Sequence, residues 1–359
     1  MSSYDFLVNQ SDLSATRLLA GTTPQLDEGQ LLLKIDRFAL TANNITYGVA
    51  GDLMGYWRFF PAEDGWGRIP VWGVATVTES RKDDIQSGSR YYGFFPMSGH
   101  LVVQPGNLSD GSFSDRLPHR ATLPGIYNRY TLMTEATGFP AGYDNHQVTY
   151  RPLFTTSFML DDFFADREFF GAARVILSSA SSKTAIGTAF NLKGRGKRLV
   201  GLTSAGNLEF VKNLGLYDQV ETYDNLPRID ASDKSVYIDM SGNRNVLETI
   251  HRHLAGNLVY SCAVGMTHHD EWNNNGMPDL PGAAPRLFFA PDQVQKRLSD
   301  WGPERFQQKL GKCWIQFLGQ VDDWITLQEY PAPEEIAPVY QSVLAGAEPD
   351  RSSVLVQVE

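Results

Sequence analysis

Between residues 174 and 263, short apolar runs alternate regularly with stretches of helical length. The apolar runs predict strands and the stretches between them predict helices, in the order strand 174–178, helix 183–193, strand 198–202, helix 207–214, strand 219–222, strand 235–239, helix 245–254 and strand 257–263. Alternation at this length is typical of a parallel sheet with helices on both faces. The runs are continuously apolar, as strands covered on both sides should be. This region therefore predicts a doubly wound α/β domain.

The residues before 150 have a different character. Alternating polar and apolar residues predict strands at 30–38, 71–77, 90–95 and 101–104, separated by Gly, Pro, Asn and Asp clusters. Helical periodicity is scarce here, which favours a small β-barrel. After residue 150 we expect a helix at 155–164. Beyond the parallel sheet we expect a strand at 287–290, helices over 291–318, a strand at 324–330, a helix at 333–344 and a strand at 353–358.

A length of 359 residues is more than a single hydrophobic core usually supports. We therefore predict two domains: a barrel domain of residues 1–150 and 324–359, and a dinucleotide-binding domain of residues 151–323. The polar stretch 266–285 is long for a loop, so we expect a lid or an interface segment.

The formal net charge of −10 disfavours nucleic acid and anionic lipid as general partners, because like charges repel. There is no apolar run of the length that a membrane span requires, and residues 1–10 lack the apolar core of a signal peptide. The two cysteines, Cys262 and Cys313, do not form a disulfide framework. These features predict a soluble, cytoplasmic protein.

A turn of small residues joins the first strand of the α/β domain to the following helix, in the segment VILSSASSKTAIG at 175–187. A dinucleotide fold places its glycine-rich turn here, so that a pyrophosphate can approach the N–H groups at the helix N-terminus. Glycine is absent from the turn itself, but small side chains permit approach, serine hydroxyls can donate, and lysine adds positive charge. We predict a cofactor site at Ser181, Ser182, Lys183, Thr184 and Ala185. A plain capped helix is the alternative, whereas a P-loop would need glycines that this stretch lacks.

The end of the second strand bears on which cofactor binds. The sequence RLVGLTS at 198–204 has no Asp or Glu to bind the ribose diol of NAD. Thr203, Ser204 and Asn207 are polar and uncharged, and we predict that they contact a 2′-phosphate. The pattern favours NADP(H) over NAD(H).

Several segments together resemble the zinc-free quinone-reductase branch of the medium-chain dehydrogenase/reductase superfamily, and more closely its DUF2855 family. They are EGQLLLKIDRFALTANNITYG, GSRYYGFF, SSASSKTA, GLTSAGNLEFVKNLGLYDQV and YIDMSGN, in the superfamily's order across most of the chain. The resemblance implies a GroES-like barrel with an inserted Rossmann domain and a cleft between them. It implies that Tyr47 lines the active cleft and that Tyr223 lies near the NADPH 2′-phosphate. Asn207 stands where a phosphate-binding lysine is common.

The candidates for chemistry follow from what hydride transfer requires, namely orientation and a donor for the developing oxyanion. We predict that Tyr47 and Asn44 donate to a substrate carbonyl and that Asn43 orients one of them, with a simple chain turn at Asn43–Asn44 as the alternative. We predict no metal site. The most metal-like cluster is His268–His269 with Asp270 and Glu271, and a solvated segment is its more common explanation.

Two further groups of side chains have both a functional and a structural interpretation. An aromatic cluster either forms the wall of a pocket or packs the barrel core, and its members are Tyr56, Trp57, Phe59, Phe60 and Trp66. His119–Arg120 either contacts an anionic group or forms a structural pair.

The sequence thus predicts an NADPH-dependent, zinc-independent reductase that transfers hydride to an enone, quinone or related activated carbonyl. A zinc-free alcohol/ketone oxidoreductase and a non-catalytic dinucleotide sensor remain as alternatives. The predicted partners are a small-molecule substrate and a second copy of the chain. The superfamily tends to form dimers through Rossmann sheet edges, and residues 257–265 are the candidate edge.

Overall fold

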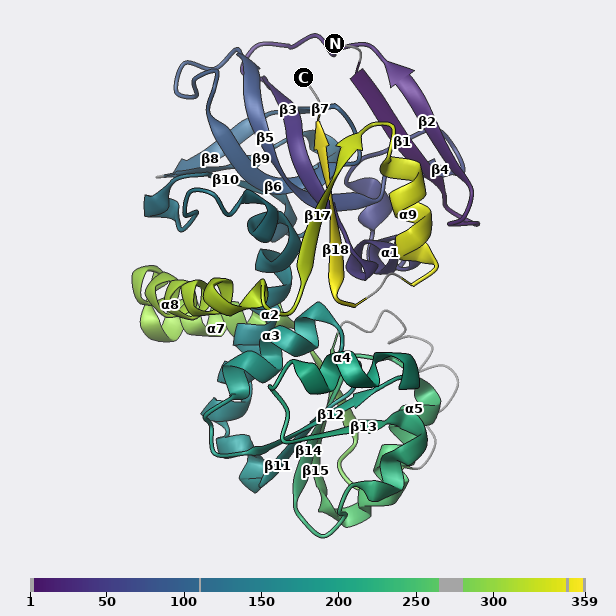
Figure 1. The fold of residues 1–359 in the computed structure, drawn as a ribbon. Helices are drawn as coiled ribbons and strands as arrows, with labels where there is room; N and C mark the ends of the chain where they lie inside the picture. The colour runs from purple at the N-terminus through teal and green to yellow at the C-terminus, as the bar shows by residue number, and fades with distance from the viewer. Residues whose placement is uncertain (1–2, 110, 265–279, 347–348, 358–359) are drawn as a thin grey trace. The chain divides into compact units, whose positions relative to one another are not determined.

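The structure, a computed structural model, describes residues 3–109, 111–264, 280–346 and 349–357. The chain divides into two compact units (Figure 1). Unit 1 comprises Met1–Arg151 and Ile325–Glu359, and unit 2 comprises Pro152–Trp324. Unit 1 is thus built from both ends of the chain, and unit 2 is inserted between them.

Unit 1 is a mainly antiparallel β structure. Within its described residues, one sheet of nine strands has the order β17-β18-β3-β5-β6-β10-β9-β8, with β7 also paired to β3. Its strands are β3 (Leu31–Leu40), β5 (Pro70–Ser80), β6 (Arg90–Pro96), β7 (His100–Val103), β8 (Pro105–Ser109), β9 (Ser112–Asp115), β10 (Arg129–Leu132), β17 (Thr326–Ala332) and β18 (Arg351–Gln357). A smaller sheet has the order β2-β1-β4, with β1 (Ser3–Asn9), β2 (Thr16–Gly21) and β4 (Trp66–Gly67).

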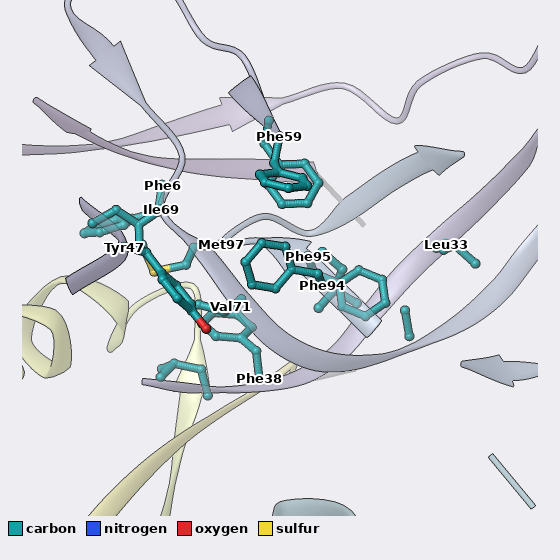
Figure 2. Close-up of a cluster of buried hydrophobic side chains, with 14 of the residues drawn as sticks. Phe6, Leu33, Phe38, Tyr47, Phe59, Ile69, Val71, Phe94, Phe95 and Met97 are labelled. Atoms are coloured by element: carbon teal, nitrogen blue, oxygen red, sulfur yellow. The ribbon is translucent and has the colours of Figure 1, made fainter. Parts of the chain in front are cut away.

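The core of unit 1 is strongly aromatic. Figure 2 shows rings from widely separated strands and loops packed together, among them Phe6, Phe38, Phe59 and Phe94. Each of these four side chains is at most 1% exposed. Helices α1 (Ala42–Val49) and α9 (Ile336–Leu344) contact each other and contribute to this core. The C-terminal segment therefore completes the core that the N-terminal segment begins.

Unit 2 contains the predicted parallel sheet. Across its described residues, six strands are all parallel in the order β13-β12-β11-β14-β15-β16. They are β11 (Arg174–Leu177), β12 (Arg198–Thr203), β13 (Gln219–Thr222), β14 (Ser235–Asp239), β15 (Leu258–Val264) and β16 (Pro285–Phe288). The first three strands run outward in one direction from β11 and the next three run outward in the other. This order is that of a dinucleotide-binding fold, in which ligands bind where the strand order reverses, here between β11 and β14.

Two of the helices of unit 2, α3 (Lys183–Leu192) and α5 (Arg244–Leu254), begin at residues whose side chains cap them. The other described helices are α2 (Asp144–Asp166, which starts in unit 1), α4 (Leu208–Asn213), α7 (Ala290–Trp301) and α8 (Pro303–Val321). Ser182 caps α3 by accepting a hydrogen bond from the Ala185 N–H, and Asn243 caps α5 by accepting from the amides of Asn245 and Val246. Such caps satisfy N–H groups that a helix start leaves unpaired.

The predicted fold class, an α/β chain with a Rossmann sheet and a separate β-rich domain, is confirmed. Two local interpretations are wrong, namely the turn weighed as the alternative at Asn43–Asn44 and the start of the helix, itself correct, that was expected at 155–164. Residues 43 and 44 do not turn the chain, because they lie inside α1, a helix missed in a segment that appeared to lack helical periodicity. The helix expected at 155–164 starts at Asp144 and includes Pro152, a residue whose missing N–H usually ends a helix.

A third wrong prediction concerns the edge of the parallel sheet. Residues 257–265 were expected to form that edge, but β15 pairs with β14 on one side and with β16 on the other. In the described part of unit 2, the strand at that end of the sheet is β16. A strand was expected at 287–290, and β16 begins two residues earlier, but its place beside β15 in the sheet was not predicted.

No helix among the described residues is both long enough and apolar enough to cross a membrane. No group of three or more potential metal ligands occurs among the described residues either. The His268–His269–Asp270–Glu271 cluster lies outside them.

Candidate functional site

The turn after β11 is the first part of the candidate site. The chain leaves the strand through Ser178 and Ser179, and Ser179 adopts a left-handed backbone conformation with φ of +51°. The Ala180 N–H then donates to the Leu202 carbonyl at 2.9 Å, which fastens the turn to β12. The turn thus reverses direction at the position where a dinucleotide fold ordinarily has its first glycine.

The N-terminus of α3 follows directly. Ser182 Oγ accepts from the Ala185 N–H at 3.3 Å, and Ser182 N donates to the Ser179 carbonyl at 2.7 Å. Lys183 and Thr184 form the first turn of the helix and are both partly exposed. The positive end of the helix dipole and the ammonium group of Lys183 favour an anion here. Four of the five residues predicted from sequence, Ser181 to Thr184, therefore form one contiguous, anion-favouring surface, whereas Ala185 is fully buried.

Side chains from the next two strands of the sheet converge on this turn. Asn207, which follows β12, donates from Nδ2 to Ser181 Oγ at 3.0 Å. Tyr223, which follows β13, accepts at its hydroxyl from Ser179 N at 2.9 Å. Two residues predicted to bind the cofactor are thus in direct contact with the serine turn.

The other two predicted residues at the end of β12 differ in exposure. Ser204 is exposed, whereas Thr203 is only 1% exposed and its Oγ1 has no hydrogen-bond partner among the described residues. A buried hydroxyl is poorly placed to meet a phosphate from solvent. The structure therefore favours Ser204 and Asn207 over Thr203 as phosphate contacts.

A hydrogen-bond network missed by sequence reasoning connects β11 to β14 where the strand order reverses. Asp239, at the end of β14, is 1% exposed, and its Oδ1 accepts from Ser178 Oγ at 2.7 Å and from Ser241 Oγ at 2.8 Å. Ser178 Oγ in turn accepts from the amides of Met240 and Ser241. The network fixes the two loops that border the reversal point. The sequence feature that could have indicated this network is the presence of polar residues at the carboxyl ends of adjacent parallel strands.

Tyr47 is the best-supported catalytic candidate, and it lies in unit 1. Helix α1 carries it into the aromatic core, and Figure 2 shows its hydroxyl among carbon-rich side chains. The hydroxyl oxygen accepts from Trp72 Nε1 at 3.3 Å. Burial raises the pKa of Tyr47 above its ordinary value, so the phenol is protonated at neutral pH. Its own proton has no acceptor among the described residues and can be donated.

The two neighbouring asparagines were predicted to have different roles. Asn43 lies in α1, four residues before Tyr47, and its predicted orienting role stays a prediction. Asn44 is 3% exposed; its Oδ1 accepts from Thr41 N at 2.8 Å, and its Nδ2 donates to the Pro70 carbonyl at 3.0 Å. Both ends of the Asn44 amide have protein partners, which favours a structural role over the predicted contact with substrate.

The aromatic cluster after α1 belongs mainly to the core. Tyr56, Trp57, Phe59 and Phe60 are all at most 8% exposed, while Trp66 is partly exposed under the guanidinium of Arg17. The packing interpretation is therefore confirmed for the first four. Tyr56 also brings a second hydroxyl near Tyr47, because the two rings lie 4.5 Å apart between centroids.

Arg120 has a structural role. It is fully buried, and its guanidinium donates to Asp115 Oδ2 at 3.0 Å, to the Tyr130 hydroxyl at 2.9 Å and to Asn128 Oδ1 at 2.9 Å. The ring of Phe60 lies 4.9 Å from the guanidinium carbon. With these partners, the side chain is not placed to contact an anionic ligand.

Residues 38–348 match the family described as protein of unknown function DUF2855. No curated protein sequence matches the chain. Among solved structures, CurA from Vibrio vulnificus in complex with NADPH is similar with a TM-score of 0.63 at 12% identity, over 99% of both chains.

Two further structures are similar over the whole chain. The yhdH oxidoreductase from Salmonella enterica in complex with NADP has a TM-score of 0.52 at 12% identity, over 99% of this chain and 100% of that one. A mutant form of enoyl thioester reductase from Candida tropicalis has a TM-score of 0.55 at 11% identity, over 99% and 100%. At such identities the likeness shows the fold alone, which is that of the medium-chain dehydrogenase/reductase superfamily.

Proposed function

The chain belongs to the DUF2855 family and has the medium-chain dehydrogenase/reductase fold, and from this premise we propose that it is an NADPH-dependent, zinc-independent reductase. It transfers hydride to an enone, a quinone or a related activated carbonyl compound. The cofactor supplies the hydride when bound. The protein binds and orients it and donates a hydrogen bond to the acceptor oxygen.

The observation that carries this proposal is the position of the serine turn in the sheet. The turn follows β11, the strand at which the order of a six-stranded parallel sheet reverses in the described part of unit 2. It leads into an N-terminus of α3 that carries Lys183. A diphosphate is the ligand class that such a helix start favours. The absence of Asp or Glu at the end of β12 and the neutral Ser204 and Asn207 support NADPH over NADH.

Tyr47 supports the choice of an activated carbonyl as acceptor. A carbonyl oxygen gains negative charge as hydride is added to its conjugated system, and a preorganised donor stabilises that charge. The Tyr47 hydroxyl already accepts from Trp72 Nε1, so its own proton is left for another acceptor, although the side chain is only 7% exposed. The enoyl thioester reductase with a similar fold supports an enone as the first acceptor to try.

Isothermal titration of the full chain with NADPH and NADH tests the cofactor claim. We expect micromolar binding of NADPH and weaker binding of NADH. Lys183→Ala should weaken NADPH binding by about tenfold to a hundredfold, because a charged hydrogen bond to phosphate contributes about 1.5–3 kcal/mol.

The matched control for this titration is Lys234→Ala. Lys234 is exposed and precedes β14, so it lies at the amino end of the sheet, opposite the turn. Its removal should leave the affinity unchanged. Absence of binding of either nucleotide to the wild-type protein would refute the reductase proposal. Binding without oxidation of NADPH by any enone, quinone or ketone would favour the sensor alternative.

We also propose that two copies of the chain associate along β16. This strand ends the parallel sheet in the described part of unit 2. Leu287 within it is 44% exposed, and Phe289, the residue after it, is 47% exposed. Exposed edge strands with apolar side chains favour pairing with another chain. Light scattering after size-exclusion chromatography should give a dimer, and Leu287→Lys should give a monomer. A wild-type monomer at micromolar concentration would contradict this proposal.

A further inference from the structure

The backbone of Ser179 is unusual for a serine. Its φ of +51° lies in the left-handed region, where a Cβ atom is crowded by the neighbouring backbone and glycine is preferred. A residue other than glycine keeps such a conformation only where its surroundings hold it there. The turn therefore needs an external constraint that a glycine at this position would not need.

Tyr223 provides a contact suited to that purpose. Its hydroxyl accepts from Ser179 N at 2.9 Å, so the backbone of the strained residue is bound to this oxygen. Tyr223 follows β13, which is two strands away from β11 in the sheet. The hydrogen bond therefore ties the turn to a distant loop and restricts the direction in which the turn can relax.

We propose that Tyr223 is a positioning residue that takes the place of the missing first glycine. It holds Ser179 in the left-handed conformation. It thereby determines the backbone path from Ser179 through Ser181 to the N-terminus of α3. This inference rests on the proposed function for its link to NADPH. The resemblance to quinone reductases implies a different task for Tyr223, namely direct contact with the 2′-phosphate.

The geometry explains how Tyr223 acts on the cofactor site from outside it. Ser182 N donates to the Ser179 carbonyl at 2.7 Å, so a rotation of the Ser179 backbone displaces the capping residue of α3. The cap and the first turn of α3 would receive the diphosphate. Loss of the Tyr223 hydroxyl therefore lowers affinity without removing any group that touches the ligand.

A mutant cycle between Tyr223 and Ser179 tests this inference. Tyr223→Phe keeps the ring and removes the hydroxyl, and NADPH should bind about tenfold more weakly, in line with the loss of a hydrogen bond and relaxation of the turn. Ser179→Gly alone should bind NADPH as the wild type does, because glycine adopts this φ without strain. The double variant Tyr223→Phe/Ser179→Gly should recover affinity to within about twofold of wild type.

The alternative tasks of Tyr223 give different results in the same cycle. If the hydroxyl binds the 2′-phosphate, Tyr223→Phe weakens binding of NADPH but not of NADH, and Ser179→Gly restores nothing. Tyr217→Phe is the matched control, because Tyr217 also contacts the turn through its hydroxyl, donating to the Ala180 carbonyl at 3.2 Å. Ser179→Gly should not improve binding in that background. Failure of the rescue at Tyr223, or an equal rescue at Tyr217, would overturn the inference.

Thermal unfolding of the same proteins decides the inference independently of cofactor binding. Tyr223→Phe should lower the unfolding midpoint, and Ser179→Gly should restore it. If the wild type binds neither nucleotide but the midpoint is restored, the proposed function fails and the role of Tyr223 stands. If NADPH binds and neither affinity nor midpoint is restored, the role of Tyr223 fails and the proposed function stands.

Discussion

Replacement of Tyr47 by phenylalanine should lower kcat for reduction of an enone or quinone by about a hundredfold, the range seen for loss of one oxyanion donor or acid group. The ring would still pack against Tyr56 and Phe94, so the core should keep its shape. NADPH binding to unit 2 should not change. Steady-state kinetics with calorimetry on the same preparation measures both effects.

Tyr56→Phe is the control for this result. The Tyr56 hydroxyl pairs with that of Tyr127 at 3.3 Å, so its loss removes a buried hydroxyl from the same cluster and leaves the hydrogen bond from Trp72 to Tyr47 in place. We expect a change in kcat of less than about fivefold, as for one neutral hydrogen bond. Equal losses in the two variants would show that general disturbance of the cluster, and not donation by Tyr47, explains the effect.

The pH dependence of the wild type follows from the same group. Burial raises the pKa of Tyr47, so the donor stays protonated as the pH rises through the ordinary tyrosine range near 10. No alkaline loss of kcat caused by this residue is therefore expected below that range. An alkaline limb near pH 8 that disappears in Tyr47→Phe would contradict the account.

Replacement of Arg120 by methionine should lower the free energy of unfolding of unit 1 by about 3–5 kcal/mol, the usual cost of removing one partner from a buried ion pair. Both side chains are at most 1% exposed, so the substitution leaves the Asp115 carboxylate buried without its counter-charge. The Tyr130 hydroxyl and the Asn128 side chain also lose a donor. Urea unfolding followed by tryptophan fluorescence measures the loss.

Two further variants test the cause of this loss. Arg58→Ala removes an exposed arginine that donates to Thr122 Oγ1 and should cost less than about 0.5 kcal/mol. Asp115→Asn/Arg120→Met removes both charges and should recover part of the stability, because no uncompensated charge remains buried. An Arg120→Met protein as stable as wild type would show that the buried pair is not needed.

The parallel sheet could be predicted from sequence because β11, β12, β14 and β15 are mainly apolar runs next to helical stretches, whereas β13, with the sequence QVET, is not. The bounds of strand β16 were not predicted correctly, because its four residues, Pro285–Phe288, are largely exposed and do not form an apolar run. Helix α1 was missed for a related reason. Its sequence ANNITYGV contains asparagines that usually favour turns, and a capping box between Thr41 and Asn44 stabilises the helix start.

The residues of the serine turn could be predicted because they are contiguous between a strand and a helix. Asn207 and Tyr223 were also expected at the cofactor site, but their hydrogen bonds to the turn could not be predicted, since these side chains reach it only after the sheet has formed. The left-handed conformation of Ser179 could not be predicted from the sequence, because a glycine is what usually indicates such a conformation and none stands here. Likewise, the Asp115–Arg120 pair is ordinary in sequence and unusual only in its complete burial.

A crystal structure of the full chain with NADPH tests the central claim most directly. We predict that the diphosphate lies within hydrogen-bond distance of the amide groups at the start of α3, with the 2′-phosphate near Ser204 and Asn207. A diphosphate bound elsewhere on the protein, or an empty serine turn in crystals saturated with NADPH, would contradict the account.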